Sequence, residues 1–117
     1  MIFHKNIMHL TKENDNFRNV LATGIHSQIV LMSLKPGEDI GYEVHHDVDQ
    51  VLVFTEGNGL ARINDKEYNI SPGDIFLVPA GTQHNFINTG KQDLKLFTIY
   101  APAEHEQGII QKLKPKK

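Results

Sequence analysis

From residue 25 onward, glycine- and proline-rich turn signals recur about every eight to twelve residues, so only short strands fit between them. The apolar, β-branched runs that these turns separate cover residues 27–34, 50–59, 60–70, 74–78 and 83–102. A two-residue hairpin turn is expected at Asn64–Asp65, inside the third run. No helical segment of any length interrupts the series. The spacing predicts an all-β fold, an antiparallel sandwich or barrel.

The chain divides into an N-terminal arm (1–24), a barrel (25–101) and a C-terminal tail (102–117), and its 117 residues suit one domain. The arm is polar with scattered apolar residues. Two structures remain as alternatives for the arm: a short helical turn over Asn14 to Asn19, or an extended arm that crosses a neighbouring sheet. The lysine-rich end, "KLKPKK", is expected to be a solvated, frayed terminus.

Composition excludes several classes of function. The net charge of −2 provides no global field for nucleic acid or an anionic membrane. The absence of cysteine excludes disulfides, thiolate catalysis and cysteine metal sites. No apolar stretch approaches the roughly 20 residues of a membrane span, and the N-terminus lacks a signal-peptide pattern, so a cytoplasmic location is expected. With seven histidines, a transition-metal site would use imidazole, carboxylate or amide ligands.

The stretch "GYEVHHDVDQ" (41–50) places two histidines side by side among acids and an amide. Successive side chains of a strand point to opposite faces, so Glu43 and His45 share one face and His46 takes the other. Gln50 opens the next extended run. Strand alternation therefore favours His45 over His46 as the partner of Glu43.

A second polar cluster, "PAGTQHNFIN", places His84 just after a turn, at the start of a strand. If His84 points inward, Phe86 and Asn88 do so too. By the same alternation Leu52 and Phe54 follow Gln50, although packing of these side chains in the core is an equally good interpretation. His26 and Arg62 are candidates for polar contacts at the pocket rim. The histidines expected at the surface are His4, His9 and His105.

The second cluster resembles the second motif of the cupin superfamily. That motif reads G, five residues, P, one residue, G, two residues, H, three residues, N. Here Gly73, Pro79, Gly81, His84 and Asn88 fill every position at the right spacing.

The first cupin motif is matched with two departures. Its usual form is H-x-H, three or four residues, E, six residues and G. Counting back from Gly57, Gln50 takes the place of the glutamate, His45 the place of the second histidine and Glu43 the place of the first. The shorter spacing would use His46 and put a valine, which cannot bind a metal, at the first position.

This resemblance covers residues 25 to 101 and implies a double-stranded β-helix, or jelly-roll, barrel with a divalent metal near its open end. Carried over, the metal ligands are Glu43, His45, Gln50 and His84. An amide oxygen is a weaker donor than a carboxylate, so Gln50 is a loose ligand, a partner of a coordinated water, or a residue that orients His45. Two imidazoles with one carboxylate suit Fe(II), Mn(II), Zn(II) or Ni(II).

The chain, including its arm, resembles small single-domain cupins of the mannose-6-phosphate isomerase-like group. The resemblance implies a metal-binding protein that acts on or binds a small oxygenated molecule, a sugar or a carboxylic acid. As an enzyme it would be an isomerase, decarboxylase or dioxygenase, with Glu43 as general base when displaced from the metal. The alternative is a non-catalytic sensor or binding module with a structural metal.

Two further expectations concern ligand and partner. An apolar, aromatic pocket floor offers few charges to hold a phosphate, which argues against a sugar phosphate. The arm and the apolar sheet edges predict a homodimer, as the resemblance to small cupins also implies.

The glycines at 57, 59, 73 and 81 are interpreted as positions of positive φ or close approach, not as a phosphate loop.

Overall fold

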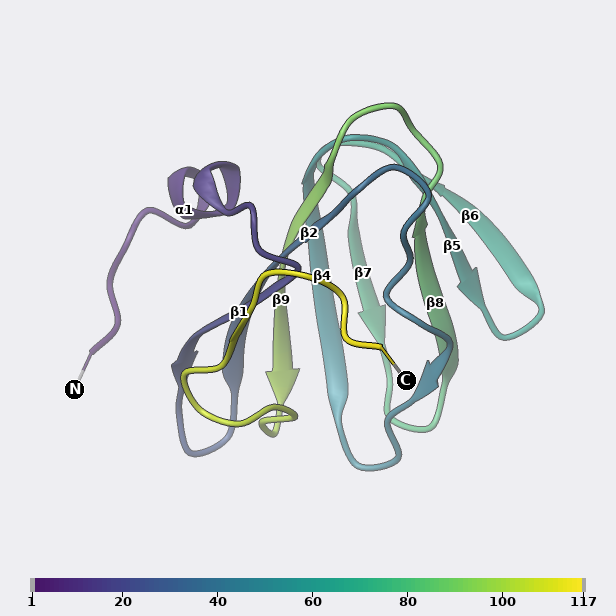
Figure 1. Cartoon of the computed structure of the whole chain (residues 1–117). Coiled ribbons are helices and arrows are strands. Elements are labelled where there is room, and N and C mark those ends of the chain that lie inside the picture. Colours follow the sequence, from purple (N-terminus) through teal and green to yellow (C-terminus); the bar gives the residue numbers. More distant parts are fainter. Residues whose placement is uncertain (1, 117) are drawn as a thin grey trace.

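Two antiparallel sheets face each other in the computed structural model, which describes residues 2–116 (Figure 1). In chain order the elements of this described part are α1 (Ile7–Glu13), β1 (Arg18–Thr23), β2 (Gln28–Leu34), β3 (Glu43–Val44), β4 (Asp49–Glu56), β5 (Gly59–Ile63), β6 (Lys66–Ile70), β7 (Ile75–Val78), β8 (Gln83–Asn88), β9 (Leu94–Ala101) and β10 (Ile110–Gln111).

The larger sheet has the strand order β10-β1-β2-β9-β4-β7, and the smaller sheet has the order β3-β8-β5-β6. Consecutive strands often lie in different sheets or at a distance within one sheet, as in a jelly roll. The predicted all-β, jelly-roll class is therefore confirmed. Within residues 2–116, no helix has the length and apolarity that crossing a membrane requires.

The strands expected from the turn signals are present, and the tight turn between β5 and β6 falls at Asn64–Asp65. Asn64 has a φ of 53°, the left-handed conformation that asparagine tolerates better than most residues. The helical turn considered for residues 14–19 is wrong, because the helix lies earlier. The side chain of Asn6 accepts a hydrogen bond from the backbone N–H of His9 at 2.9 Å and so caps the start of α1.

Both ends of the chain take part in the larger sheet. β1 lies within the predicted arm and β10 within the predicted tail, and the two strands pair with each other. The backbone N–H of Phe17 donates to the carbonyl of Lys112 at 3.1 Å, and the ammonium of Lys114 forms an ion pair with Asp39. The tail is thus held against the two sheets as far as Lys114, so the expectation of a frayed terminus is wrong for this part of it.

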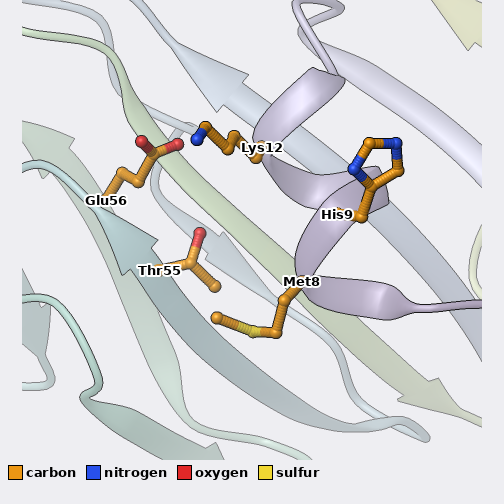
Figure 2. A pocket seen from close by; sticks show the side chains of 5 residues that line it. All are labelled: Met8, His9, Lys12, Thr55 and Glu56. Carbon is orange, nitrogen blue, oxygen red and sulfur yellow. The ribbon is translucent and has the colours of Figure 1, made fainter.

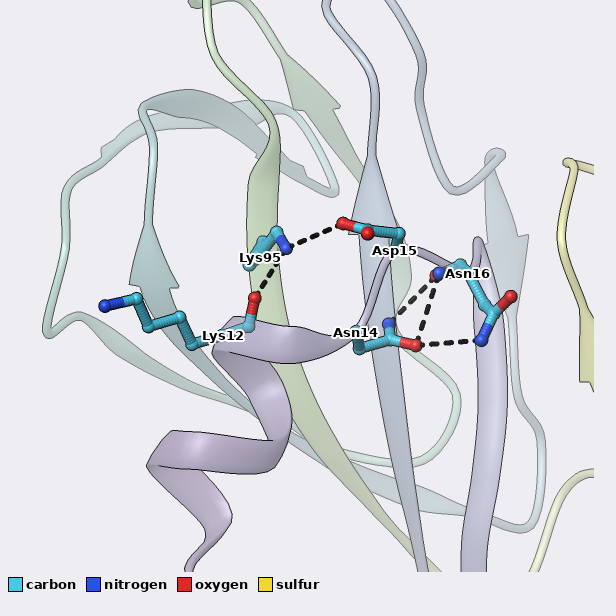
Figure 3. A network of polar contacts seen from close by, with 5 residues as sticks. All are labelled: Lys12, Asn14, Asp15, Asn16 and Lys95. Atoms are coloured by element: carbon cyan, nitrogen blue, oxygen red, sulfur yellow. Dashed lines mark hydrogen bonds and ion pairs between the residues drawn. The ribbon is translucent and has the colours of Figure 1, made fainter.

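A polar network joins the helix to the larger sheet (Figure 3). The ammonium of Lys95 on β9 donates to the carbonyl of Lys12 at 2.7 Å and to the carboxylate of Asp15 at 3.1 Å. The amide of Asn14, just after α1, exchanges hydrogen bonds with Asn16. These contacts fix the turn between α1 and β1.

Aromatic rings fill the interior between the sheets. Phe54 and Phe86 are fully buried, and their ring centroids lie 5.5 Å apart, with Phe76 at 5.8 Å and 5.4 Å from them. Such tilted and edge-on contacts are the favoured geometry of aromatic pairs. This part of the barrel is packed core, so Phe54, one of the predicted pocket residues, lies in the core.

The glycines of the two motifs occupy constrained positions, as predicted. Gly57 has a φ of 89°, and a Cβ built there would lie 2.6 Å from the carbonyl oxygen of Asp93. Gly73 has a similar φ of 94°, but its Cβ would meet nothing within 4 Å. Glycine is thus required at position 57 by both the positive φ and the close contact, and at position 73 by the positive φ alone.

We expect Gly57→Ala to lower the free energy of unfolding by roughly 3 kcal/mol or more, because a contact with fixed backbone adds to the left-handed strain. The matched control Gly73→Ala carries only the strain, about 1–2 kcal/mol. Urea denaturation of both variants measures the difference. Equal losses would contradict the close contact at Gly57.

Candidate metal centre

The residues predicted as metal ligands lie on or beside strands of both sheets, and the two histidines among them are neighbours. Glu43 on β3 and His84 on β8 are cross-strand partners, so their side chains lie on the same face. His45 follows β3, and its ring centroid lies 5.2 Å from that of His84. Gln50 is the second residue of β4, in the opposite sheet, and is 1% exposed.

The backbone fixes the tautomer of His84. Its Nδ1 lies 2.9 Å from the carbonyl oxygen of Thr82, which can only accept, so Nδ1 carries the proton. Burial lowers the pKa of His84 and the neighbouring His45 adds to this effect, whereas the bond to Thr82 and the charge of Glu43 oppose it. The imidazole is therefore kept neutral with its Nε2 lone pair free, and Nε2 is buried with no hydrogen-bond partner among the described residues.

A chain of hydrogen bonds orients the amide of Gln50. The hydroxyl of Thr98 donates to the carbonyl of Val51 at 2.8 Å, so its oxygen is available to accept. The Nε2 of Gln50 donates to that oxygen at 3.1 Å. The other end of the amide, Oε1, is buried and has no partner within residues 2–116. The hydrogen bond to Thr98 thus leaves the amide with one unused, buried acceptor.

His45 receives its orientation from a residue far along the chain. Its Nδ1 lies 3.4 Å from a carboxylate oxygen of Glu104, and its ring stands edge-on to Tyr100 at 5.8 Å between centroids. The ring is 8% exposed, and its Nε2 is buried without a partner in the described chain. A carboxylate behind one ring nitrogen holds the lone pair of the other nitrogen ready for a ligand.

Three donor atoms, the Nε2 of His45, the Oε1 of Gln50 and the Nε2 of His84, are thus buried and unpartnered. Such groups normally cost free energy, and one explanation is an ion that they hold when it is bound. Within residues 2–116, no cluster of three or more histidine, cysteine, aspartate or glutamate side chains is close enough to hold a metal. The set suits a divalent ion only if the Gln50 amide contributes.

Glu43 is half-buried, and its carboxylate forms no ion pair or side-chain hydrogen bond with any described residue. Its charge still acts on the interior, because it opposes the lowering of the pKa of His84 that burial causes. Glu43 therefore lies across from His84, but among the described residues Glu43, His45 and His84 are not gathered closely enough to hold a metal by themselves.

The other predicted residues divide into those at the site and those away from it. Phe86 lies below the site, its ring centroid 6.0 Å from that of His84, and Leu52 follows Gln50 on the inner face of β4. Asn88 is fully buried, but its amide is used up by the carbonyls of Leu34 and Gln92 and the N–H of Gly90. Asn88 thus fixes a turn and has no free group for a ligand.

The predicted rim residues do not reach the site. His26 is exposed in the turn between β1 and β2. Arg62 is exposed on β5 and pairs with Glu67 at 2.9 Å. His46 is also exposed, in agreement with the strand alternation that separated it from His45.

Sequence reasoning missed the segment after β9, which closes one side of the site. The fully buried side chain of Gln28 holds this segment by accepting from the backbone N–H groups of Glu104 and His105 at 3.2 and 3.0 Å and donating to the carbonyl of His105 at 2.7 Å. His105, expected at the surface, is instead half-buried against Tyr100, with 5.1 Å between ring centroids. No local sequence pattern indicates a contact over such a separation in the chain.

A hollow on the outside of the barrel, between α1 and β4, contains none of the predicted site residues (Figure 2). The side chains that line it are Met8, His9, Lys12, Thr55 and Glu56. It is separate from the histidine pair, which lies between the sheets.

Comparison with known proteins agrees with this architecture. Residues 30–100 match the family model described as "Cupin domain". The chain is 44% identical over 118 residues to the uncharacterized protein YrkC of Bacillus subtilis (strain 168), covering 96% of this chain and 63% of YrkC. The chain therefore spans less than two thirds of the length of that relative.

Two further similarities concern a solved structure and a named binding protein. The crystal structure of BH2720 from Bacillus halodurans superposes with a TM-score of 0.96 at 42% identity, covering 97% of this chain and 91% of that one. The oxalate-binding protein of Thermotoga maritima is 29% identical over 68 residues, which cover 58% of this chain and 56% of that protein.

We expect the stability of the protein to fall as the pH drops below about 6.5, partly because of His105. Burial lowers the pKa of His105 to about 4, and the charges of Arg18 and His45 add to the effect. The unfolded chain therefore takes up a proton that the folded chain refuses, at a cost of at most about 1.4 kcal/mol per pH unit for one group.

In His105→Gln the free energy of unfolding should thus depend less on pH than in the original protein between about pH 7 and pH 5. His46→Gln, at an exposed loop position, is the control. Urea denaturation across this range provides the measurement. A pH dependence that His105→Gln leaves unchanged would refute the assignment.

Proposed function

This chain belongs to the cupin family, and from that premise we propose that it binds a divalent transition metal and, through it, a small oxygenated molecule. The observation that carries the proposal is the group of three buried, unpartnered donor atoms on His45, Gln50 and His84. Each donor is oriented by a separate hydrogen bond or carboxylate contact. Zn(II), Mn(II), Fe(II) and Ni(II) all accept such nitrogen and oxygen ligands.

Glu43 is the fourth member of the proposed set. As a ligand it supplies the one negative charge, which matters because Gln50 is neutral where the family motif has glutamate. When a bound molecule displaces it, its carboxylate can take a proton from that molecule. Its half-buried position across from His84 supports both roles.

When bound, a divalent metal would polarise an oxygen of the ligand and stabilise negative charge on it. The residues of the chain do the rest. Phe86 and Leu52 form an apolar floor that excludes water, and Glu43 holds or releases the proton. This arrangement suits isomerisation, decarboxylation or dioxygenation of a sugar or carboxylic acid.

The similarity to an oxalate-binding protein supports a carboxylic acid over a sugar as the ligand. The same similarity favours a second candidate, a binding module that holds its ligand without turnover. An enzyme requires product formation that is lost in His45→Ala. A binding module requires ligand binding without product, and a purely structural metal requires stabilisation by the metal with no effect of the ligand.

Metal analysis tests the site directly. We expect the protein expressed with excess metal to carry about one divalent ion per chain, and His45→Ala or His84→Ala to lose most of it, because each removes one donor nitrogen. His46→Ala, next to His45 but exposed, is the matched control and should retain the metal. Inductively coupled plasma mass spectrometry gives the content. Metal-free protein, or equal loss in the control, would overturn the proposal.

We also propose that the chain forms a homodimer through the outer face of its larger sheet. Two apolar side chains on the edge strand β7, Ile75 and Leu77, are each 65% exposed. Val51 on β4 lies opposite Leu77 on one side and Ile99 on β9 on the other, so the apolar strip continues across neighbouring strands. A second copy that presents the same strip would remove it from water.

Leu77→Glu should therefore convert a species of about twice the 13.2 kDa chain mass into a monomer. A buried carboxylate would be costly in the interface but harmless at this position of a free chain. Light scattering after size exclusion measures the mass. Leu113→Glu, at a 69% exposed apolar position in the tail, is the control. A monomeric starting protein would exclude the dimer.

A further inference from the structure

The outer face of the larger sheet carries a row of apolar side chains. Residues opposite one another on paired strands share a face of the sheet. The row crosses four strands in register and consists of Leu77 on β7, Val51 on β4, Ile99 on β9 and Ile29 on β2. Contiguous apolar surface that faces outward is typical of an interaction site.

The helix covers only one end of this face. α1 contacts β9, β4 and β2, and Leu31 on the outer face of β2 is 2% exposed. Ile29, two residues earlier on the same face, is only half-buried. Ile75 and Leu77 on the edge strand β7 are largely exposed. The row from Leu77 to Ile29 therefore lies beyond the cover of the helix.

Two hollows lie between this row and the segment before α1, with volumes of about 640 and 270 Å³. Residues 3–5 and Ile29 line both of them, and Phe97 and Ile99 line the smaller one. The segment before α1 stands apart from the sheets in Figure 1. The two hollows thus form one groove with an apolar floor on β2 and β9, which is called the arm groove below.

The arm groove and the edge strand have opposite charges. His4 and Lys5 line both hollows, and no aspartate or glutamate is among the described residues that line them. Residues 71–82, which include β7, contain one acid, Asp74, and no lysine or arginine. The Oδ2 of Asp74 accepts a hydrogen bond from the backbone N–H of Ser71 at 2.8 Å. The carboxylate is therefore fixed directly beside the exposed Ile75.

We infer that the arm groove is the docking site of strand β7 from a second copy of the chain. Ile75 and Leu77 protrude from the same face of β7, and the apolar floor of the groove offers both of them a partner surface. β7 and the groove lie at opposite ends of one row, so a twofold axis places each β7 on the groove of the other copy. This inference depends on the proposed homodimer and specifies which parts of the two chains meet.

Docking would also cover an open edge of the larger sheet. β7 is the last strand of that sheet and pairs on one side only, with β4. The unpaired side of an edge strand tends to associate with other chains. Residues 2–5, which border the groove, belong to no helix or strand, so their backbone groups are available to this edge.

The arm groove reaches the segment that supports the candidate metal centre. Gln107 and Gly108 line the larger hollow. They follow Glu104, whose carboxylate stands behind His45. A docked β7 would hold this segment between two chains. The second copy would thus brace the support of His45 without touching the donor atoms.

The chain contains no cysteine, so cross-linking of introduced cysteines tests the contact directly. Chains with His4→Cys and chains with Leu77→Cys carry different tags, are produced together and are treated with a short bis-maleimide. We expect links between the two tags. Leu77→Cys paired with Leu113→Cys, at an exposed position in the tail, is the control and should stay unlinked. Links between two Leu77→Cys chains in place of mixed links would overturn the inference.

The charges provide a second test. We expect Lys5→Glu to weaken the association of the two copies about 5-fold, the scale of an exposed ion pair. Adding Asp74→Asn should restore part of the loss, because it removes the new repulsion and keeps an acceptor for Ser71. Lys66→Glu makes the same charge change on the smaller sheet and is the control. Analytical ultracentrifugation measures the dissociation constants, and equal losses at both lysines would contradict the contact.

Hydrogen exchange, measured on chelated protein, tests the bracing of the segment behind His45. We expect the backbone amides of residues 104–108 to exchange more slowly in the dimer than in the Leu77→Glu monomer. Mixed cross-links without this protection would retain the docking site and reject the bracing.

These outcomes are distinguishable from failure of the proposed function. A dimer by light scattering that gives no mixed cross-links would retain the proposed dimer and reject the arm groove as its docking site. A monomeric protein would reject both. Metal uptake is measured separately and does not enter either result.

Discussion

Strand register in the larger sheet is the constraint on which the site depends. Tyr100 on β9 lies directly between Gln28 on β2 and Gln50 on β4, so three inward-facing residues with polar groups form one row across three strands. Two residues further along the inner face of β4 the side chain is Leu52, and the aromatic core follows. A shift of one residue in any pairing would turn this row outward and place apolar side chains in water. The register that buries the core therefore also positions the polar end of the barrel.

Each candidate donor is held by a group of a different kind. A backbone carbonyl fixes His84, the hydroxyl of Thr98 fixes Gln50, and the carboxylate of Glu104 stands behind His45. Thr98 lies on β9 and Thr82 in the turn before β8, whereas Glu104 lies in the segment after β9 that Gln28 holds. The interior thus contains donors whose directions are set before any ligand arrives, which reduces the reorganisation that binding would require.

Sequence could predict the part of this arrangement that depends on local alternation and motif spacing. Alternation separated His45 from His46, and the second motif placed His84 at the start of a strand. It could not predict Glu104 or His105, because their contact with Gln28 joins segments more than 70 residues apart, and neither segment shows a periodic pattern that reflects it. The helix lies earlier than expected for a different reason, because the side chain of Asn6 caps its start just before Ile7.

The hydrogen bonds of Gln28 have a consequence for how such proteins are recognised and trimmed. The family match covers residues 30–100, yet Gln28 lies before it, and the carboxylate behind His45 belongs to residue 104, after it. A fragment cut at the limits of the match would keep the motif histidines and lose both the support of His45 and the side chain that anchors that support. The part of the chain that the family model matches is therefore smaller than the part that supports the candidate site, and boundaries for engineering should follow the hydrogen bonds of Gln28.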